Sequence, residues 1–120
     1  MGVRAVRGAT TVAQDSTVAI DESVRELVSA MIERNGIQKD QLISLLFTAT
    51  ADLHAMFPAA AARAMGLGDV PLMCAQELSI VGAVTHCVRV MMHIEDDRDR
   101  GQIHHVYLRG AVGLRDDLPE

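Results

Sequence analysis

An amphipathic helical pattern between residues 20 and 32 constrains this fold more than any other feature of the sequence. Apolar side chains recur there at intervals of three and four residues, which gathers them on one face of an α-helix. They are Ile20, Val24, Leu27, Val28, Met31 and Ile32. A helix with one apolar face must bury that face against another layer of structure.

Both ends of this helix carry termination signals. Residues 15–17 are all good N-cap residues, and Asp21 and Glu22 are expected in the first turn, where the helix dipole favours negative charge. Arg34 is expected in the last turn, and Gly36 suits the position after the C-cap. The helix is therefore predicted to begin after these N-cap candidates and to end just before Gly36.

Strands are predicted on both sides of this helix. The clearest runs from Cys87 to Glu95, where Val88, Val90, Met92 and Ile94 face one way and Cys87, Arg89, Met91 and His93 the other. Residues 3–12, 42–50 and 70–75 also read as strands, the second of them buried. Residues 103–114 read as a last long strand, with a possible break near Gly110.

A second helix is predicted from Pro58, which suits a first helical position, through Met65 to a stop at Gly66. Residues 80–85 are ambiguous, and residues 95–101 read as a charged turn. The 120 residues fit one α/β domain, residues 1–120, with roughly five strands and two helices.

Composition excludes several functional classes. The formal net charge is −5, and the chain has no Trp, one Tyr and two Phe, so it lacks the basic face and the stacking platforms of a nucleic-acid binder. No signal peptide or bilayer-spanning apolar run is seen, so we expect a soluble cytoplasmic protein. Cys74 and Cys87 are expected to be free thiols in that compartment.

Three charged residues are candidates for a binding site. Arg89 lies within an otherwise apolar strand, where a guanidinium is costly to bury without a partner. The plainer alternatives are a solvated sheet face or an ion pair with an internal carboxylate. Arg7, at the end of the first strand, and Glu77, after a short apolar strand, are open to the same plain interpretations. The excess of Arg over Lys is typical both of a GC-rich genome and of carboxylate recognition.

Other chemistries find no support in the residue pattern. The five histidines have no i, i+4 helical pair, His104 and His105 would point to opposite faces of a strand, and no cysteine pair has zinc spacing. Cys74 has no neighbouring base that would activate it. We therefore expect no metal site, and the residue pattern identifies no covalent nucleophile.

Five blocks of sequence resemble the small trimeric chorismate mutases, the AroH class, in the order and spacing of that family. They are Val3 to Val12, Thr48 to Ala59, Cys74-Ala-Gln-Glu, Cys87-Val-Arg-Val-Met-Met with His105-Val-Tyr-Leu, and Leu114-Arg-Asp-Asp-Leu. The resemblance implies a mixed sheet with two main helices, assembled as a homotrimeric pseudo-α/β-barrel with an active site between neighbouring subunits.

The resemblance also implies the reaction and the residues that perform it. Chorismate would become prephenate by a [3,3] sigmatropic rearrangement, for phenylalanine and tyrosine synthesis, without a cofactor or a proton transfer. Arg89 would stabilise the ether oxygen, which gains negative charge as its bond to carbon opens. Arg7 would bind a carboxylate, and Glu77 the ring hydroxyl. The remaining substrate-binding positions implied are Phe57, Arg63, Met73, Cys74, Tyr107, Leu114 and Arg115.

The match has departures, and rival functions stay open. Ala60 stands where some members of the family have Lys, and Met73 where a smaller polar residue can occur. Asp116 stands directly after Arg115, at a position where the family often has Pro. A non-catalytic trimer that binds a small dicarboxylate is one rival. A Rid-type imine or enamine hydrolase on a similar fold is another, and a structural subunit with ordinary ion pairs is a third.

Overall fold

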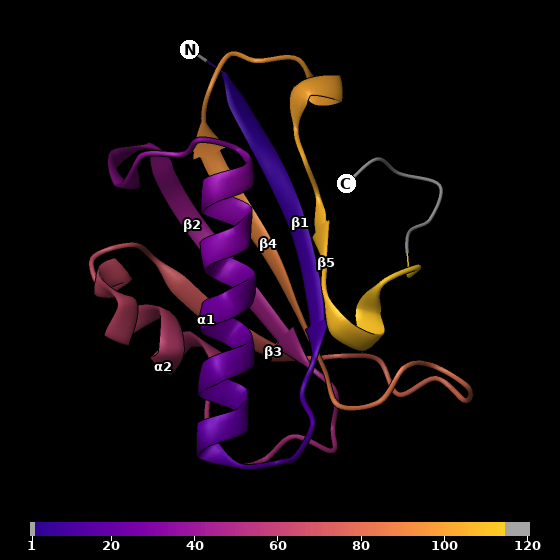
Figure 1. The fold of residues 1–120 in the computed structure, drawn as a ribbon. Coiled ribbons are helices and arrows are strands. Elements are labelled where there is room, and N and C mark those ends of the chain that lie inside the picture. Colours follow the sequence, from indigo (N-terminus) through magenta and orange to yellow (C-terminus); the bar gives the residue numbers. More distant parts are fainter. Residues whose placement is uncertain (1, 115–120) are drawn as a thin grey trace.

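A computed structural model describes residues 2–114 as one five-stranded sheet with two helices packed on it (Figure 1). In chain order the main elements are β1 (Val3–Thr11), α1 (Thr17–Arg34), β2 (Leu42–Ala49), α2 (Pro58–Ala62), β3 (Leu72–Gln76), β4 (Cys87–Glu95) and β5 (Val106–Tyr107). The strand order is β3-β2-β4-β1-β5. β4 runs antiparallel to both β1 and β2, whereas β3 is parallel to β2 and β5 is parallel to β1.

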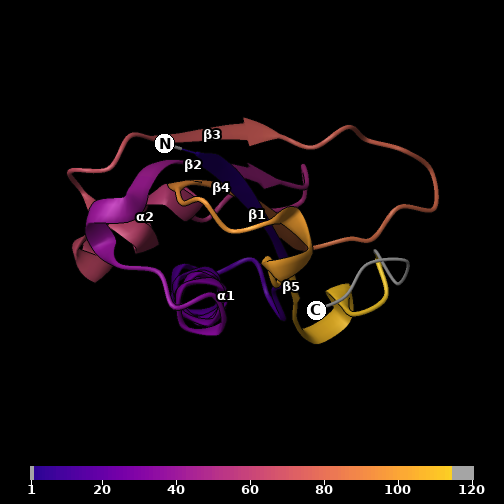
Figure 2. The ribbon, with the colours of Figure 1, turned by 90° about the horizontal axis from the view of Figure 1, so that it is seen from above.

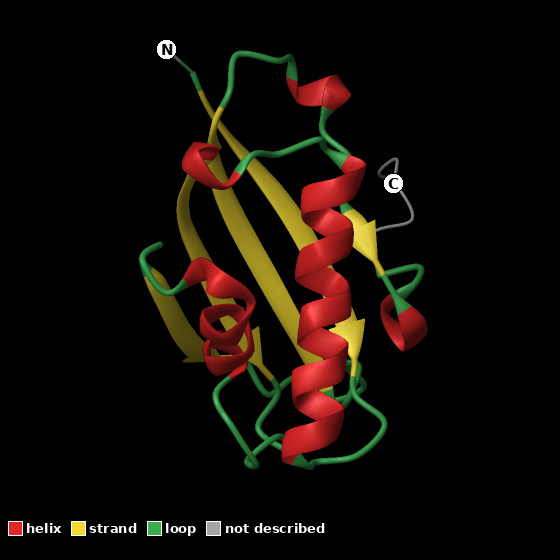
Figure 3. Cartoon of the chain, turned by 60° about the vertical axis from the view of Figure 1, so that its left-hand side comes forward, coloured by secondary structure: helices red, strands yellow, loops and turns green. Residues whose placement is uncertain are grey.

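Both helices lie on the same side of the sheet, as the view from above shows (Figure 2). The apolar face of α1 packs on the even-numbered side chains of β4 and on Val6 of β1, and these residues form the main core. Figure 3 views the sheet from the side that carries these helices; the opposite side, which we call the open face, is covered by neither α1 nor α2. Arg89, Met91 and His93 lie on this open face, so the alternation predicted for β4 is confirmed.

The predicted helix α1 is confirmed, with one correction at its start. Ser16 is the N-cap, and its Oγ accepts a hydrogen bond of 3.2 Å from the backbone N–H of Ala19. Because the helix begins at Thr17, Asp21 and Glu22 lie in the second turn rather than the first. Arg34 lies in the last turn, and Gly36 follows the cap with a φ of +57°.

Two other predicted elements have different bounds. α2 ends at Ala62 and continues as a wider π-helical turn, Arg63–Leu67, in which Gly66 has a φ of +93°. β2 is only partly buried, because just Leu45 and Phe47 along it are inaccessible. The ambiguous residues 80–85 form a loop.

The prediction of a long last strand over residues 103–114 is wrong. Only Val106–Tyr107 pair with β1, and a short 3₁₀ turn, Arg109–Ala111, follows. Arg109 has a φ of +52° and Gly113 a φ of +94°, and a left-handed backbone turns the chain away from the sheet. Alternation could not reveal this, because a strand needs a partner along its whole length.

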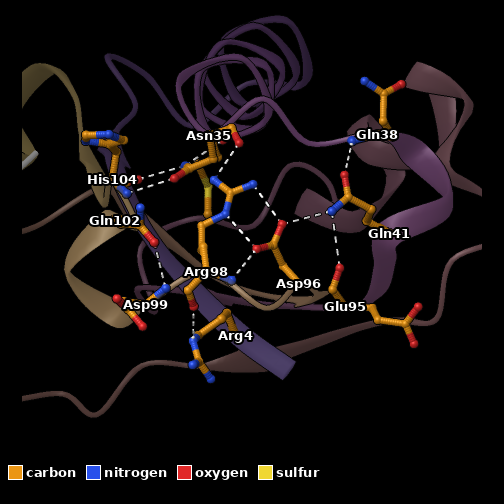
Figure 4. Close-up of polar contacts among 11 residues, drawn as sticks. Arg4, Asn35, Gln38, Gln41, Glu95, Asp96, Arg98, Asp99, Gln102 and His104 are labelled. Atoms are coloured by element: carbon orange, nitrogen blue, oxygen red, sulfur yellow. Dashed lines mark hydrogen bonds and ion pairs between the residues drawn. The ribbon is translucent and has the colours of Figure 1, made fainter. Parts of the chain in front are cut away.

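A polar network fastens the C-terminal end of α1 to the end of β4 (Figure 4). The Arg98 guanidinium donates to the backbone carbonyl of Asn35 (2.7 Å) and to the Asp96 carboxylate (2.8 Å). The Asn35 side chain bonds the backbone of His104 in both directions, as donor (2.9 Å) and acceptor (2.7 Å). The bond from Arg98 satisfies the Asn35 carbonyl, which the helix end leaves without an intrahelical partner.

Candidate functional site

Arg89 lies at the centre of the open face, where β4 runs between β1 and β2. Its neighbours in the sheet register are Ala9 on β1 and Thr48 on β2. Its side chain is 41% exposed, and its Nε lies 3.2 Å from Oε1 of Glu77. The Arg89 Nε is buried and has no hydrogen-bond partner among the described residues, so its contact with Glu77 is an ion pair. The cation is therefore paired with a carboxylate but still accessible to a ligand.

Glu77 reaches Arg89 because it directly follows β3. Its backbone N–H donates to the Ala49 carbonyl (2.9 Å), which extends the β2–β3 pairing by one residue. Its Oε2 accepts a short hydrogen bond from the Thr48 hydroxyl. The Glu77 carboxylate is thus held by one contact from β2 and one from β4.

Arg7 and Tyr107 complete a hollow of about 270 Å³ with Glu77 and Arg89. Arg7 lies on β1, and its backbone N–H donates to Nδ1 of His105 (2.9 Å). Tyr107 lies on β5 and is nearly buried. The structure therefore brings four predicted site residues together from four different parts of the chain.

The chemistry that this hollow can support is binding and charge stabilisation. Two guanidinium groups can bind carboxylates, one carboxylate can accept a hydrogen bond from a hydroxyl group, and one phenol can donate a hydrogen bond. Gly8, Ala9, Leu46, Val90 and Met91 supply apolar walls. Among the described lining residues there is no cysteine, serine or lysine.

Phe57 and Cys74 line a different hollow, of about 570 Å³, beside the edge strand β3 and the start of α2. Ala60 lines it too, and Phe57 is 72% exposed. Cys74 alternates with Met73 on β3, so Cys74 faces this hollow while Met73, 65% exposed, points to the other side. Cys74 and Glu77 thus line different hollows, although only three positions separate them in the sequence.

The other predicted positions are more scattered. Arg63 is exposed where α2 passes into its π-helical turn. Leu114 is half-buried and packs on a small cluster of Ala9, Cys87, Tyr107 and Ala111, next to the Arg89 hollow. Arg115 and Asp116 lie outside the described residues.

A loop between β3 and β4 adjoins the Arg89 hollow and is anchored by Asp52. Burial on its own would raise the pKa of Asp52, but hydrogen bonds from the Thr50 hydroxyl (2.5 Å) and the His86 backbone (3.0 Å) outweigh it and lower that pKa. Asp52, Glu77 and Arg89 line a further hollow of about 200 Å³ under this loop. The Cys87 thiol, where β4 begins, is buried, and burial raises its pKa.

Thr48 is the site residue that sequence reasoning missed. Its hydroxyl is the hydrogen-bond donor that orients Glu77, and it lines the hollow. The signal in the sequence was that Thr48 is a polar residue in an otherwise apolar strand, where it shares a face with Leu46. A single sequence does not show that Arg89 of another strand lies next to Thr48 on that face.

Residues 2–114 contain neither a cluster of metal ligands nor a membrane-spanning helix. Within residues 2–114, no three His, Cys, Asp or Glu side chains converge on a point that could hold a metal ion. The helices of this part are all too short or too polar to cross a bilayer.

Comparison with known proteins gives consistent relatives. The sequence pattern of the family described as chorismate mutase type I matches residues 3–118. The chain is 42% identical over 119 residues to chorismate mutase AroH of Bacillus subtilis (strain 168), covering 98% of this chain and 94% of that protein. It is 44% identical over 117 residues to chorismate mutase AroH of Thermus thermophilus, covering 97% and 96%.

A solved structure agrees with these sequence matches. The fold superimposes on a chorismate mutase from Clostridium thermocellum with a TM-score of 0.88 and 46% sequence identity. The match covers 90% of this chain and 96% of that one. At this identity, the likeness extends beyond a shared arrangement of strands and helices.

Proposed function

Since this chain belongs to the chorismate mutase type I family and is therefore an isomerase, we propose that it rearranges chorismate to prephenate in the hollow around Arg89. Arg89, Glu77 and Arg7 are the proposed catalytic residues. The observation that carries the proposal is the convergence of these three side chains with Tyr107 around one cavity. The reaction serves aromatic amino acid biosynthesis.

The proposed mechanism relies on fixed charge rather than on acid–base chemistry. Chorismate is a dianion, and its ether oxygen becomes more negative as the C–O bond opens while a C–C bond forms. A guanidinium held beside that oxygen stabilises the transition state more than the bound substrate. Arg89 suits this role because the β-sheet fixes its backbone on both sides.

Arg7 and Glu77 then position the substrate. Arg7 binds a carboxylate, and Tyr107 donates a hydrogen bond to one. The Glu77 carboxylate, which the Thr48 hydroxyl orients, accepts a hydrogen bond from the ring hydroxyl of the substrate. Holding the substrate in its reactive, folded shape supplies much of the rate acceleration of a unimolecular rearrangement.

We further propose that the active unit is a homotrimer whose active sites lie between subunits. Two observations support this. Phe57 and Cys74 line a separate hollow from Arg89, so one chain presents two incomplete parts of the site. The open face also exposes the large apolar side chains of Val3, Leu46 and Met73, which a second copy would bury. Arg63, on the α2 side of the chain, is proposed to belong with Phe57, and Leu114 with Arg89. A cytoplasmic location stays a prediction.

A direct turnover assay tests the proposed function. Purified protein is mixed with chorismate, and the loss of chorismate absorbance is followed together with the appearance of prephenate. We expect saturable turnover without any added cofactor or metal. Binding without conversion would favour the dicarboxylate-binding rival, whereas no binding would favour the structural one.

The pH dependence of turnover tests the mechanism. Because no proton moves in the rearrangement, we expect kcat to stay within about twofold between pH 6 and pH 9, without the bell shape of an acid–base pair. The measurement is a kcat profile in buffers of constant ionic strength. A steep limb near pH 6.5 would show that a histidine takes part and would contradict the mechanism.

A further inference from the structure

The residue directly before β4 has an unusual backbone conformation. His86 has a φ of +49°, in the left-handed region that few residues other than glycine adopt. β4 begins at Cys87, and Arg89 lies two positions further along this strand. A backbone held in a sparsely populated conformation persists only where the surrounding structure fixes it. The groups that hold His86 therefore set the direction in which the chain enters β4.

Both backbone groups of His86 have partners from other parts of the chain. Its N–H donates to the two oxygens of the Asp52 carboxylate, at 3.0 and 3.2 Å. Its carbonyl accepts a hydrogen bond of 2.7 Å from the N–H of Val12, which directly follows β1. The left-handed residue is thus held from the end of β1 and from the turn after β2.

The Asp52 carboxylate also reaches the first residue of β4 through a hydroxyl group. The Thr50 hydroxyl donates to Oδ1 of Asp52 (2.5 Å) and accepts a hydrogen bond from the N–H of Cys87 (3.0 Å). The Thr50 N–H in turn donates to the Cys87 carbonyl (3.0 Å). One carboxylate therefore orders two consecutive backbone N–H groups, one directly and one through Thr50, just before Arg89.

We propose that Asp52 is a positioning residue for the rearrangement, whose carboxylate acts through Thr50 and the His86 backbone to place the Arg89 guanidinium against the substrate. This inference rests on the proposed function, because it takes Arg89 as the fixed cation. All of the hydrogen bonds that carry it lie within one chain, so it does not depend on what covers the open face. A misplacement of about 1 Å can cost an enzyme up to about 100-fold in rate, which makes such a device worth having.

Removal of the carboxylate tests the proposal. Asp52→Ala should lower kcat about tenfold and change KM less, because a displaced cation matters most when the ether oxygen becomes negative. Asp52→Asn keeps one acceptor oxygen and should recover part of kcat. Asp96→Asn is the matched control, since Asp96 also accepts a backbone N–H but at the far end of β4. It should lower Tm and leave kcat unchanged. All rates are measured well below the Tm of each variant.

A second variant separates the backbone contact from an ordinary ion pair. The His86 ring also approaches Asp52, with Nε2 at 3.7 Å from Oδ2. His86→Asn removes the ring but keeps a residue that tolerates the left-handed region, together with both backbone groups. It should retain normal kcat. If His86→Asn lost as much kcat as Asp52→Ala, the side-chain pair would be the important contact and the backbone route would be refuted.

Nuclear magnetic resonance gives a readout that does not require turnover. In Asp52→Ala, the amide protons of His86 and Cys87 should exchange with solvent about tenfold faster, whereas that of Glu95 should not change. The Nε–H signal of Arg89 should also shift. An unchanged Arg89 signal, or an unchanged kcat, in folded Asp52→Ala would overturn the proposal. If the unmodified protein failed to convert chorismate, the proposed function would fail, but the Arg89 signal would still decide whether Asp52 positions that side chain.

Discussion

At the scale of single residues, the central question is how a guanidinium can stand in an apolar strand. Arg89 faces the open side of the sheet, where its side chain stays 41% exposed, and Glu77 lies 3.2 Å from its Nε. Partial exposure reduces the desolvation cost, and the carboxylate supplies a partner. Both plain interpretations of Arg89, a solvated face and an internal ion pair, are therefore partly correct, and neither removes it from the cavity.

The first prediction concerns this cation. Arg89→Ala should lower kcat by about 10²–10³-fold, the range seen when one fixed transition-state donor is removed. The protein should remain folded, because the side chain is outside the core. Steady-state kinetics with circular dichroism as the folding control will measure it. Arg34→Ala, on the distant surface of α1, should turn over normally, and near-normal turnover by Arg89→Ala would refute the assigned role.

The second prediction concerns Thr48. Thr48→Val keeps the shape of the side chain but removes the hydroxyl that orients Glu77, so kcat/KM should fall about tenfold, the equivalent of one charge-assisted hydrogen bond. Thr48→Ser should restore most of the loss, because it restores the donor. If Thr48→Val and Thr48→Ser have the same kcat and KM, the Thr48 hydroxyl has no positioning role.

At the scale of elements, the strands that carry the site are held in register at both ends. At the site end, Thr50 and Cys87 exchange backbone and side-chain hydrogen bonds of 3.0 Å, which fixes β2 against β4. At the far end, Asp96 and Arg98 connect the end of β4 to Asn35, the C-cap residue of α1. Stability and site geometry are therefore linked through the same strand.

The third prediction tests the far-end network (Figure 4). Hydrogen bonds from the Arg98 side chain and backbone, with one from Gln41, hold the pKa of Asp96 well below its usual range. A carboxyl whose pKa is lowered on folding contributes stability above its unfolded pKa of about 3.9 and loses it as the pH falls further. Asp96→Asn should therefore lower Tm at pH 7, and its difference from the unmodified protein should shrink below about pH 4.

A matched variant distinguishes this network from an ordinary surface ion pair. Asp69 pairs with Lys39 at 3.1 Å, but its side chain is 74% exposed, compared with 13% for Asp96. Asp69→Asn should change Tm far less at pH 7. Thermal unfolding of both variants from pH 3 to pH 8 makes the comparison. An equal loss in the two variants would mean that the Asp96 network adds nothing beyond surface charge.

At the scale of the whole molecule, one sheet presents two faces with different tasks. The helices bury one face and build the core, whereas the open face carries the Arg89 hollow and exposed apolar side chains. The Phe57 hollow lies beside the edge strand β3. This division is what leads us to place the complete active site between copies.

The last prediction tests sites shared between subunits. Arg89→Ala and Arg63→Ala homotrimers should each be nearly inactive. When the two variants are unfolded together and refolded as mixed trimers, about a quarter of the sites would combine two intact halves, and activity should return to about that fraction. The measurement is turnover before and after mixing, with size-exclusion chromatography to verify the trimer. Failure to recover any activity in verified mixed trimers would show that each site lies within one chain.

The sequence by itself determined the elements whose pattern is local. One face of α1 and one face of β4 pack against the core, and this leaves a period of apolar residues within each element. Such a period can be recognised from neighbouring residues alone. The resemblance to a known family pointed to Arg7, Glu77, Arg89 and Tyr107 before any geometry was available. Local pattern also misled where a partner was missing, since residues 103–114 read as one long strand but pair with β1 at only two positions.

Only the tertiary structure decided which side chains meet. The register places Arg89 opposite Thr48, the parallel pairing of β3 with β2 delivers Glu77 to both, and β5 places Tyr107 beside β1. It also placed Cys74 in another hollow than Glu77. The physical reason is that sheet pairing joins residues far apart in the chain, and their separation in sequence carries no record of that pairing.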